Sequence, residues 1–450
     1  MGRAKKSRSL ALWMNGELVG HWRLPVTGSQ EFLYAESWLG SSAVRPISLS
    51  LPLRPSQEPY REHVESFFDN LLPDNRQIRE RIQRRFQTAS IAAFDLLQEI
   101  GRDCVGALQL LHEDEPAPDV RRITGESLTP AGVEQILAGA IGPSMGQQEN
   151  EDAFRISLAG AQEKTALLWH EGQWHRPTGT TPTTHILKLP IGVSPHGIDL
   201  STSVENEWLC AQIVRAYGIE VAACRMETFG AFKTLIVERF DRRLSDDRTW
   251  WLRLPQEDFC QATGTPPALK YENEGGPGIR KIMDLLLGSE QSTSDRRDFI
   301  RTQLVFWLLA GIDGHAKNFS LFLLRGGGFR LTPRYDVLSA HPMLGHGRGR
   351  LSPEKITMAM ALEGKNRHYR WNGIRLCHWL ETGKRCGVPQ METLVRGVID
   401  RTPVALAEVR NVVPPGFPAE MADTVLDGVQ AAAKQLGEEI AVSATSSSET

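Results

Sequence analysis

The sequence predicts an α+β fold in which a strand-rich region precedes a helix-rich region. Short apolar runs bounded by turn residues recur up to about residue 255, for example at 165–169, 185–189 and 234–240. Beyond that point the pattern is mainly helical, and residues 299–310 form the most apolar segment. A chain of 450 residues has room for about two to four domains of ordinary size.

The composition is that of a globular protein in a reducing compartment. Hydrophobic residues make up 41% and charged residues 23% of the chain, and the net charge of −3 argues against a general polyanion binder. None of the six cysteines forms a CxxC pair, so neither a zinc knuckle nor a disulfide lattice is expected. The longest apolar run, 304–312, is about half a membrane span. We therefore expect a cytoplasmic protein that does not enter membranes.

The N-terminal region begins with a predicted β-hairpin. Residues 10–22 are mostly apolar on both sides of Asn15-Gly16, a dipeptide that accepts the positive φ angles of a type I′ turn. Further on, apolar residues recur every four positions between 78 and 86 among charged neighbours, which predicts an amphipathic helix. Asp74 or Asn75 can cap the start of this helix.

An acidic linker separates the hairpin region from the rest of the chain. Residues 113–119 (EDEPAPD) contain two prolines and no periodicity. A helix capped near Thr129-Pro130 follows, and a second helix is expected at 203–217 among the strands. The predicted organisation is an N-terminal β-rich subdomain at 1–112, a linker at 113–124, a strand-rich lobe at 125–255, a helical lobe at 256–440 and a disordered tail at 441–450.

Residues 312–318 (IDGHAKN) carry the strongest chemical signal. Asp313 and Asn318 have the D-x₄-N spacing of a kinase catalytic loop, in which the Asp accepts the proton of the attacking hydroxyl and the Asn holds Mg²⁺. A glycine-rich hairpin at 321–332 returns the chain to near its start, so Asp336 is expected to face both residues. One carboxylate and one amide oxygen, completed by phosphate and water, suit octahedral Mg²⁺.

The same residues also have plainer interpretations. Asp313-Gly314 fits an ordinary turn, Asn318 fits a cap, and His315 fits a hydrogen-bonded histidine with no catalytic role. The order of apolar helix, loop, hairpin and second aspartate favours the catalytic interpretation.

Residues 157–165 (SLAGAQEKT) form a second candidate motif. Small residues between two predicted strands allow backbone N–H groups to approach phosphates closely. The segment matches neither a Walker A loop nor G-x-G-x-x-G, and an ordinary hairpin turn is the alternative.

Two further segments have the pattern of a kinase strand-rich lobe. Lys188 lies inside an apolar strand, where a kinase places its ATP-phosphate lysine, and Glu205 or Glu207 downstream is available to orient it. The alternative is a solvated edge-strand lysine. Residues 237–242 (VERFDR) lie where a kinase hinge presents backbone groups to adenine, and a surface ion-pair cluster is their alternative.

Taken together, these segments resemble the HipA family, the serine/threonine kinase toxins of bacterial toxin–antitoxin pairs. The resemblance implies a two-lobed protein-kinase-like fold with phosphoinositide-kinase-like features and a small N-terminal β-rich subdomain. The matching segments occur in order along nearly the whole chain: FFDNLLPDN (67–75), FDLLQEIGRDCVGA (94–107), SLAGAQEKTALL (157–168), THILKLP (184–190), VERFDR (237–242), LRLPQEDFCQ (252–261), YENEGGPGI (271–279), DGHAKNFS (313–320) and LTPRYDVLSA (331–340).

The resemblance also implies a role for each matching residue. Asp313 is the implied catalytic base, Asn318 and Asp336 are the implied Mg²⁺ ligands, and Ser157 matches the serine that family members autophosphorylate to switch themselves off. The implied ATP site comprises a phosphate loop (Ala159, Gly160, Ala161, Gln162, Glu163 and Lys164), the lysine Lys188, the adenine-contacting Glu238 and Phe240, and the phosphate-lining His315, Lys317, Asn318 and Asp336.

The function implied by the resemblance is an ATP- and Mg²⁺-dependent protein kinase toxin that causes growth arrest and persistence. Its implied target is glutamyl-tRNA synthetase, and its implied partner is a small helix-turn-helix antitoxin (HipB-like), with which it acts as corepressor on operator DNA in the nucleoid. Two alternatives stay open: a DNA-bound corepressor that acts mainly by binding, and a small-molecule kinase of the aminoglycoside or lipid type. The intact set of Asp313, Asn318 and Asp336 favours an enzyme over a pure binder.

Positively charged residues are concentrated in one stretch of the C-terminal region, residues 348–385. Residues 348–385 contain nine Lys or Arg and three acidic residues, a net charge of +6 in a chain whose total is −3. Basic side chains on phosphates add salt-dependent affinity for DNA, so Lys384 and Arg385 are candidate DNA-proximal residues. A solvated basic face is the alternative.

Overall fold

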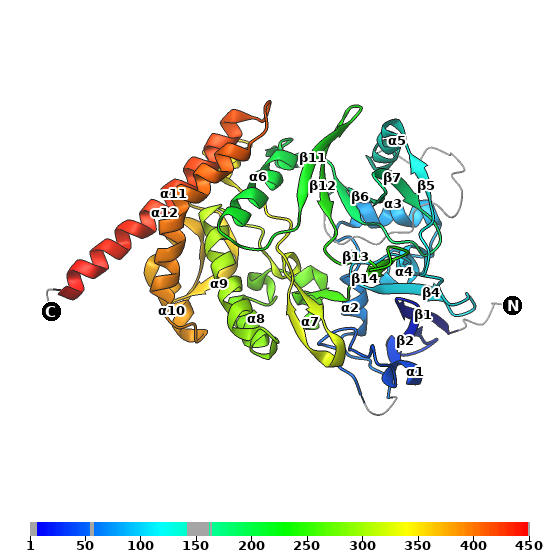
Figure 1. Ribbon diagram of the computed structural model, residues 1–450. Helices are drawn as coiled ribbons and strands as arrows, with labels where there is room; N and C mark the ends of the chain where they lie inside the picture. The colour runs from blue at the N-terminus through cyan, green and yellow to red at the C-terminus, as the bar shows by residue number, and fades with distance from the viewer. Residues whose placement is uncertain (1–6, 55–57, 142–161, 163, 449–450) are drawn as a thin grey trace. The chain divides into compact units, whose positions relative to one another are not determined.

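The computed structural model describes residues 7–54, 58–141, 162 and 164–448 (Figure 1). The chain divides into two compact units, each built from several segments. The first unit comprises residues 1–189, 227–268 and 320–329, and the second comprises 190–226, 269–319 and 330–450.

The first unit opens with a four-stranded antiparallel sheet in the order β3-β2-β1-β4. The predicted hairpin at 10–22 is confirmed, and Asn15 and Gly16 have φ angles of 48° and 89°, as a type I′ turn requires. The strands of this sheet are β1 (Arg8–Met14), β2 (Glu17–Leu24), β3 (Glu31–Tyr34) and β4 (Leu108–His112).

Helices bury the apolar face of this sheet. Trp22 of β2 stacks on Phe68 with a centroid distance of 3.8 Å, and Phe94 packs against the same indole at 4.8 Å. The predicted amphipathic helix at 78–86 is confirmed, and Asn75 rather than Asp74 caps it by accepting a hydrogen bond from Gln77 N at 2.8 Å. The helices are α1 (Glu36–Leu39), α2 (Val64–Asp69), α3 (Arg76–Phe86) and α4 (Ala93–Ile100).

A six-stranded sheet in the order β11-β12-β8-β6-β7-β5 carries the candidate ATP lysine, Lys188, on β8. Figure 1 labels five of its strands: β5, β6, β7, β11 and β12. Helix α5 (Pro130–Ile141) contacts it, and Thr129 Oγ1 accepts a hydrogen bond from Gly132 N, as the predicted cap requires. The predicted strand at 154–158 lies outside the described residues. The strands are β5 (Gly125–Leu128), β6 (Lys164–His170), β7 (Gln173–Pro177), β8 (His185–Lys188), β11 (Cys224–Phe229) and β12 (Phe232–Glu238).

Short strands complete the first unit. The predicted glycine-rich hairpin is confirmed: Gly326 and Gly327 have φ angles of 74° and 91°, and Leu324 N donates to Gly328 O at 2.7 Å. The elements are β13 (Arg242–Leu244) paired with β14 (Trp251–Arg253), β15 (Gln256–Asp258) paired with β16 (Ser320–Leu323), α7 (Phe259–Ala262), and β17 (Phe329–Leu331), which begins at the end of this unit.

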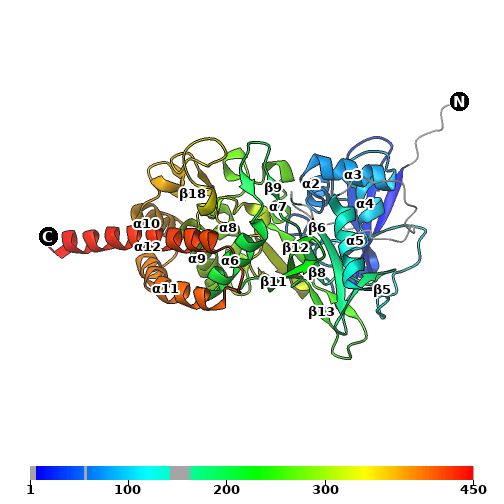
Figure 2. The same ribbon diagram turned by 90° about the horizontal axis from the view of Figure 1, so that it is seen from above.

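The second unit is mainly helical, as predicted for those of its residues that follow residue 255. Helix α12 contacts both α10 and α11 (Figure 2). The helices are α6 (Ser203–Ala216), α8 (Ile279–Leu285), α9 (Ser292–Leu308), α10 (Leu376–Arg385), α11 (Met391–Val412) and α12 (Ala419–Ser448), and the strands are β9 (Gly192–Val193), β10 (Asp199–Leu200), β18 (Thr357–Glu363) and β19 (Arg367–Arg370).

Helix α9 forms the centre of the second unit. Residues 299–308 of the apolar segment predicted at 299–310 form the C-terminal half of this helix, and nearly all residues of the segment are buried. Trp307 is fixed by a reciprocal pair of hydrogen bonds in which each indole N–H of Trp307 and Trp371 donates to the main-chain oxygen of the other residue, at 3.0 and 2.8 Å. The loop that follows α9 is therefore attached to a helix that is buried and hydrogen-bonded at its C-terminal end.

The C-terminal tail differs from its prediction. Residues 441–450 are predicted to be disordered because the sequence after Ser443 lacks apolar side chains, whereas α12 continues through Ser448. Extending an existing helix costs far less than starting one, so weakly helical residues can continue it. Within the described part of the chain, no helix combines the length and the apolar character needed to cross a bilayer.

Candidate active site

The loop between α9 and β16 is held in a tight conformation. Gly311 N donates to Phe306 O at 2.7 Å, which closes the end of the helix, and Ala310 has a positive φ of 46°. A Cβ atom on Gly314 would lie 2.6 Å from the ring of Phe306. Only glycine fits at that position, so the Asp-Gly dipeptide seen in the sequence allows the loop to approach the helix closely.

Asp313 is the exposed member of a loop whose other polar side chains are buried. The Asp313 side chain is 57% exposed, whereas His315, Lys317 and Asn318 are 4%, 6% and 4% exposed as whole residues. The main-chain oxygen of Asp313 accepts hydrogen bonds from His315 N at 2.8 Å and from Asn318 Nδ2 at 2.7 Å. The loop therefore presents one carboxylate to solvent from a fixed backbone.

The chemistry of Asn318 and Asp336 fits a magnesium ion. Because Asn318 Nδ2 donates to the Asp313 backbone, its Oδ1 is left to accept or to coordinate. Asp336 is half-buried with a φ of 59°, a left-handed conformation that aspartate tolerates better than most residues. An amide oxygen and a carboxylate are the hard oxygen ligands that Mg²⁺ takes together with phosphates.

Hydrogen bonds tie the segment around Asp336 to the loop. Tyr335 Oη donates to Lys317 O at 2.9 Å, next to Asn318 in the chain. Farther along, Ala340 N donates to Ala310 O at 3.1 Å, at the start of the loop. The loop residues Asp313, His315, Lys317 and Asn318 and the segment carrying Asp336 all belong to the second unit.

Lys188 lies at the end of β8 in the first unit and is 6% exposed. In the sheet it pairs with Lys164 on β6 and with Leu235 on β12. Residues directly opposite each other on antiparallel strands point to the same face, so the two ammonium groups share one face of the sheet. A face with two ammonium groups attracts an anion such as a phosphate.

Only part of the predicted phosphate loop can be described. Gln162 Nε2 donates to Leu189 O at 2.5 Å, directly after Lys188, and Lys164 begins β6. Four further loop residues and the candidate autophosphorylation site lie outside the described residues: Ala159, Gly160, Ala161, Glu163 and Ser157.

The two candidate adenine residues lie within the first unit. Glu238 is exposed at the end of β12, and the ring of Phe240 packs edge-on against Phe322 at 5.7 Å and 89°. The chain stays in the first unit through Ala268, so these residues are not at the crossing between units. Glu205 and Glu207, the candidate partners of Lys188, are buried on α6 in the second unit.

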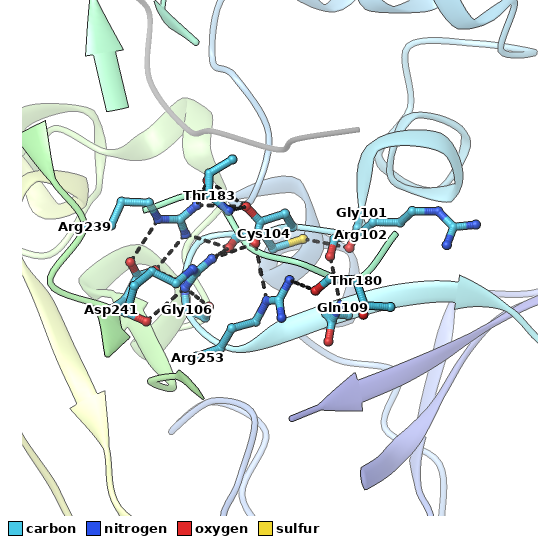
Figure 3. Close-up of polar contacts among 12 residues, drawn as sticks. Gly101, Arg102, Cys104, Gly106, Gln109, Thr180, Thr183, Arg239, Asp241 and Arg253 are labelled. Carbon is cyan, nitrogen blue, oxygen red and sulfur yellow. Dashed lines mark hydrogen bonds and ion pairs between the residues drawn. The ribbon is translucent and has the colours of Figure 1, made fainter. Parts of the chain in front are cut away.

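A buried ionic network, which the sequence did not reveal, lies beside these strands (Figure 3). The alternative interpretation of 237–242 was a surface ion-pair cluster; the ion pairs exist, but Arg239 and Asp241 are 4% and 2% exposed. Arg239 Nη2 donates to Asp241 at 2.8 Å and to Cys104 O at 2.8 Å. The network consists of Asp103, Asp241, Arg239, Arg242 and Arg253.

Asp103 is the centre of this network. Burial raises its pKa, but Arg242, Arg239 and Arg253 outweigh burial and hold the pKa below its ordinary value, so the carboxylate is ionised. Asp103 Oδ2 accepts hydrogen bonds from Thr183 N at 3.0 Å and from Thr183 Oγ1 at 2.7 Å. Thr183 lies just before β8, so the network fixes the start of the strand that carries Lys188.

The two candidate DNA-proximal residues differ in their surroundings. Both lie at the end of α10 and are exposed. Arg385 donates to Glu363 at 2.8 Å and to Glu381 at 2.6 Å, so two carboxylates already engage its charge. Within the described part of the chain no such contact is recorded for Lys384, which makes it the better candidate for a phosphate contact.

Comparison with known proteins defines the class of this chain. It is 32% identical to "Putative kinase Y4mE" of Sinorhizobium fredii over 412 residues, which covers 89% of this chain and 92% of that one. It is 25% identical over 426 residues, 91% of each chain, to the serine/threonine-protein kinase toxin HipA of Shewanella oneidensis. The chain is a protein serine/threonine kinase and, as a kinase, uses ATP.

Two family models show to which family of kinases the chain belongs. Residues 10–111 match the HipA N-terminal domain and residues 156–406 match the HipA-like C-terminal domain, which alone covers more than half of the chain. The chain therefore belongs to the HipA family of kinase toxins. Its fold is also that of HipA in the Shewanella oneidensis complex of HipA, HipB and operator DNA, with a TM-score of 0.77, 23% identity, and coverage of 94% of this chain and 96% of that one.

Proposed function

We propose that the chain transfers the γ-phosphoryl group of ATP to a serine or threonine hydroxyl of another protein, and that Asp313 is the catalytic base that accepts the proton of this hydroxyl. The observation that carries this proposal is the 57% exposure of its side chain on a loop whose neighbouring polar residues are buried. In the transfer, the acceptor oxygen bonds to the γ-phosphorus while the bond to the β–γ bridging oxygen breaks. ADP leaves, and the acceptor's proton passes to Asp313.

Asn318 and Asp336 are the proposed Mg²⁺ ligands. The Oδ1 of Asn318, whose amide nitrogen is engaged by Asp313 O, and the carboxylate of Asp336 support this role, because both are hard oxygen ligands. Mg²⁺ bound with ATP supplies positive charge that neutralises the β- and γ-phosphate oxygens. His315 and Lys317 line the phosphates in this proposal, and their burial on the same loop keeps them in place.

Two lysines on neighbouring strands are further candidates for phosphate contacts. Lys188 and Lys164 contact the phosphates, and their positions opposite each other on neighbouring strands support this assignment. The loop 159–164 covers the phosphates, and Glu238 and Phe240 contact adenine. The phosphoinositide-kinase-like features of the lobes and the subdivision at 1–112, 125–255 and 256–440 are part of the same proposal.

The proposed biological role is that of a toxin that arrests growth and produces persistence by phosphorylating glutamyl-tRNA synthetase. A HipB-like antitoxin and operator DNA are the proposed partners, with which the chain acts as corepressor at the nucleoid; otherwise it is cytoplasmic. The support is the similar fold of HipA, which was solved with HipB and operator DNA.

Ser157 is the proposed off switch. A phosphoserine adds about −1.5 to −2 charges two residues before a loop that receives the phosphates of ATP. Like charges repel, so the modified loop binds Mg-ATP less well. Protein phosphorylated at Ser157 is expected to have lost most of its Mg-ATP affinity in calorimetry. Equal affinity in the two forms would rule this switch out.

The protein substrate can be identified by comparing phosphopeptides from cells that express the wild type and the Asp313→Ala variant. We expect serine or threonine phosphopeptides of glutamyl-tRNA synthetase only with the wild type, together with growth arrest. Growth arrest by a well-expressed Asp313→Ala variant would reject the catalytic proposal. Phosphopeptides from a different protein would keep the kinase and change the target.

A further inference from the structure

The segment 271–278 (YENEGGPG) is a distinct motif to which no role has been assigned above. We propose that its first residue, Tyr271, positions the catalytic base: its hydroxyl holds one oxygen of Asp313 so that the other receives the proton of the acceptor. This inference rests on the proposed role of Asp313. All residues involved belong to the second unit.

Tyr271 and the residue before it make three contacts with the catalytic loop. Its hydroxyl donates a hydrogen bond to Asp313 Oδ1. Its ring packs edge-on against the ring of His315, with a centroid distance of 5.0 Å and an interplanar angle of 86°. The preceding residue, Lys270, accepts a hydrogen bond from Ala316 N through its main-chain oxygen at 3.3 Å. The tyrosine therefore contacts the loop through its ring and its hydroxyl, and the residue before it contacts the same loop through its main-chain oxygen.

The glycines of the motif build a rigid support for the tyrosine. Gly276 N donates to Tyr271 O at 2.9 Å, and a Cβ atom on Gly276 would lie 2.2 Å from Leu269 O. Gly275 has a φ of 106°, a conformation that favours glycine. These two positions therefore require glycine so that the chain can fold back on Tyr271.

A glutamate fixes the other side of this turn. Glu272 Oε2 accepts a hydrogen bond from Ala361 N at 2.6 Å, and Glu272 Oε1 lies 3.5 Å from Arg367 Nη1. A Cβ atom on Gly278 would lie 2.0 Å from the Glu272 carboxylate carbon, so the glutamate needs glycine there. The motif thus places the phenol hydroxyl at a defined point beside the loop.

An exposed aspartate needs such a contact to act as a base. Without a partner, a carboxylate that is 57% exposed rotates about its side-chain bonds in water. The hydroxyl of Tyr271 occupies Oδ1, and His315 Nε2 lies 3.9 Å from the same oxygen. In the described part of the chain no partner is recorded for Oδ2, which is thus the oxygen available to an acceptor hydroxyl.

The Tyr271→Phe variant tests this role because it removes the hydroxyl and keeps the ring on His315. Tyr217→Phe is the matched control, since the Tyr217 hydroxyl also contacts an oxygen, Thr402 Oγ1 at 2.8 Å, away from the loop. The measurement is the initial rate of ³²P transfer from ATP to purified glutamyl-tRNA synthetase and to the chain itself. ATP affinity is measured by calorimetry, the melting temperature by circular dichroism, and Asp313→Asn sets the inactive baseline.

We expect Tyr271→Phe to lower kcat about 10- to 100-fold, the range that misplacement of a catalytic group produces, with ATP affinity and melting temperature close to those of Tyr217→Phe. A kcat within twofold of the control, with Asp313→Asn inactive, would overturn the inference and leave the proposed base intact. A parallel loss of ATP affinity or folding in Tyr271→Phe would assign the residue a structural role and also overturn it. Wild-type transfer rates in Asp313→Asn would instead reject the proposed base and, with it, this inference.

Discussion

The side-chain amide of Asn318 donates a hydrogen bond to the main-chain oxygen of Asp313 at 2.7 Å. This contact joins the two ends of the D-x₄-N motif and explains its spacing, because the intervening turn brings Asn318 back onto the residue it serves. The bond uses the amide nitrogen, so the amide oxygen keeps a defined direction. Asn318 thus has two proposed tasks: it fixes the loop and it binds Mg²⁺.

The Asn318→Asp variant separates these two tasks. Aspartate is a strong Mg²⁺ ligand, but its second oxygen would face the Asp313 carbonyl with no proton to donate. We expect this variant to lose at least about tenfold in phosphoryl transfer, with no recovery as Mg²⁺ is raised. The measurement is the transfer rate against Mg²⁺ concentration. Full activity at high Mg²⁺ would show that only the ligand role matters.

The buried network around Asp103 positions the strand that carries Lys188, so a change in this network is expected to alter the affinity for Mg-ATP. Thr183→Val removes the hydroxyl that donates to Asp103 Oδ2 and accepts from Arg239 Nη1 at 2.9 Å. Thr402→Val is the matched control, because Thr402 is also a fully buried, hydrogen-bonded threonine, far from β8 in sequence. Both variants are expected to lose about 1–3 kcal/mol in denaturant unfolding.

Only Thr183→Val is expected to weaken Mg-ATP binding as well, because Thr183 lies just before the strand that ends with Lys188. Calorimetry with Mg-ATP distinguishes the two variants. If both bound Mg-ATP as the wild type does, the network would serve stability alone.

Glu257 predicts a measurable dependence of stability on pH. Burial raises its pKa from 4.5 to about 8, although its carboxyl group accepts hydrogen bonds from Ser48 Oγ and Leu49 N. Between those two values the unfolded chain has released the proton while the folded chain retains it. Raising the pH therefore favours the unfolded state, and the stability that is present below pH 4.5 is lost progressively up to about pH 8.

The Glu257→Gln variant removes this titration and keeps an amide that can bond to both neighbours. We expect its free energy of unfolding, relative to the wild type, to increase from pH 5 to pH 8 and then to level off. Denaturant unfolding of both proteins at several pH values gives this difference. A difference that stays constant with pH would mean that the buried carboxyl group is already ionised.

The sequence predicts features that depend on neighbouring residues and misses those that depend on distant ones. The Asn15-Gly16 turn and the Asn75 cap were predictable because each acts within a few positions of the chain. The contact of Tyr271 with Asp313 joins residues 42 positions apart, and that of Arg239 with Asp103 joins residues 136 apart. Local patterns carry no information on such pairs.

The sequence also does not show whether a charged motif is buried in the folded chain. VERFDR has the composition of a solvated ion-pair cluster, and only the folded chain reveals that its arginines are buried against the turn at 103–106. The end of the chain from Ser443 is rich in Ser and Thr, but it continues a helix that begins at Ala419. The composition of these residues alone does not predict that the helix continues through them.

The basic stretch at 348–385 predicts a difference between two neighbouring charges. The double variant Lys384→Glu with Arg385→Glu should weaken binding of the toxin–antitoxin complex to operator DNA. Most of the loss should come from Lys384→Glu, which should also reduce the salt dependence of log K by about one unit of slope. Arg385→Glu should have the smaller effect on DNA, because Glu363 and Glu381 already engage that guanidinium. Unchanged affinity and salt slope in Lys384→Glu would leave solubility as the role of the charge.

The most direct test of the central claim is label transfer from γ-³²P-ATP by purified wild-type protein and its Asp313→Asn variant, with glutamyl-tRNA synthetase as acceptor. Asparagine keeps the size of the side chain and removes its capacity to take a proton, so binding of Mg-ATP should be retained in calorimetry. The account predicts Mg²⁺-dependent serine or threonine labelling by the wild type and a loss of at least about a thousandfold in the variant. Transfer by Asp313→Asn at the wild-type rate would contradict it.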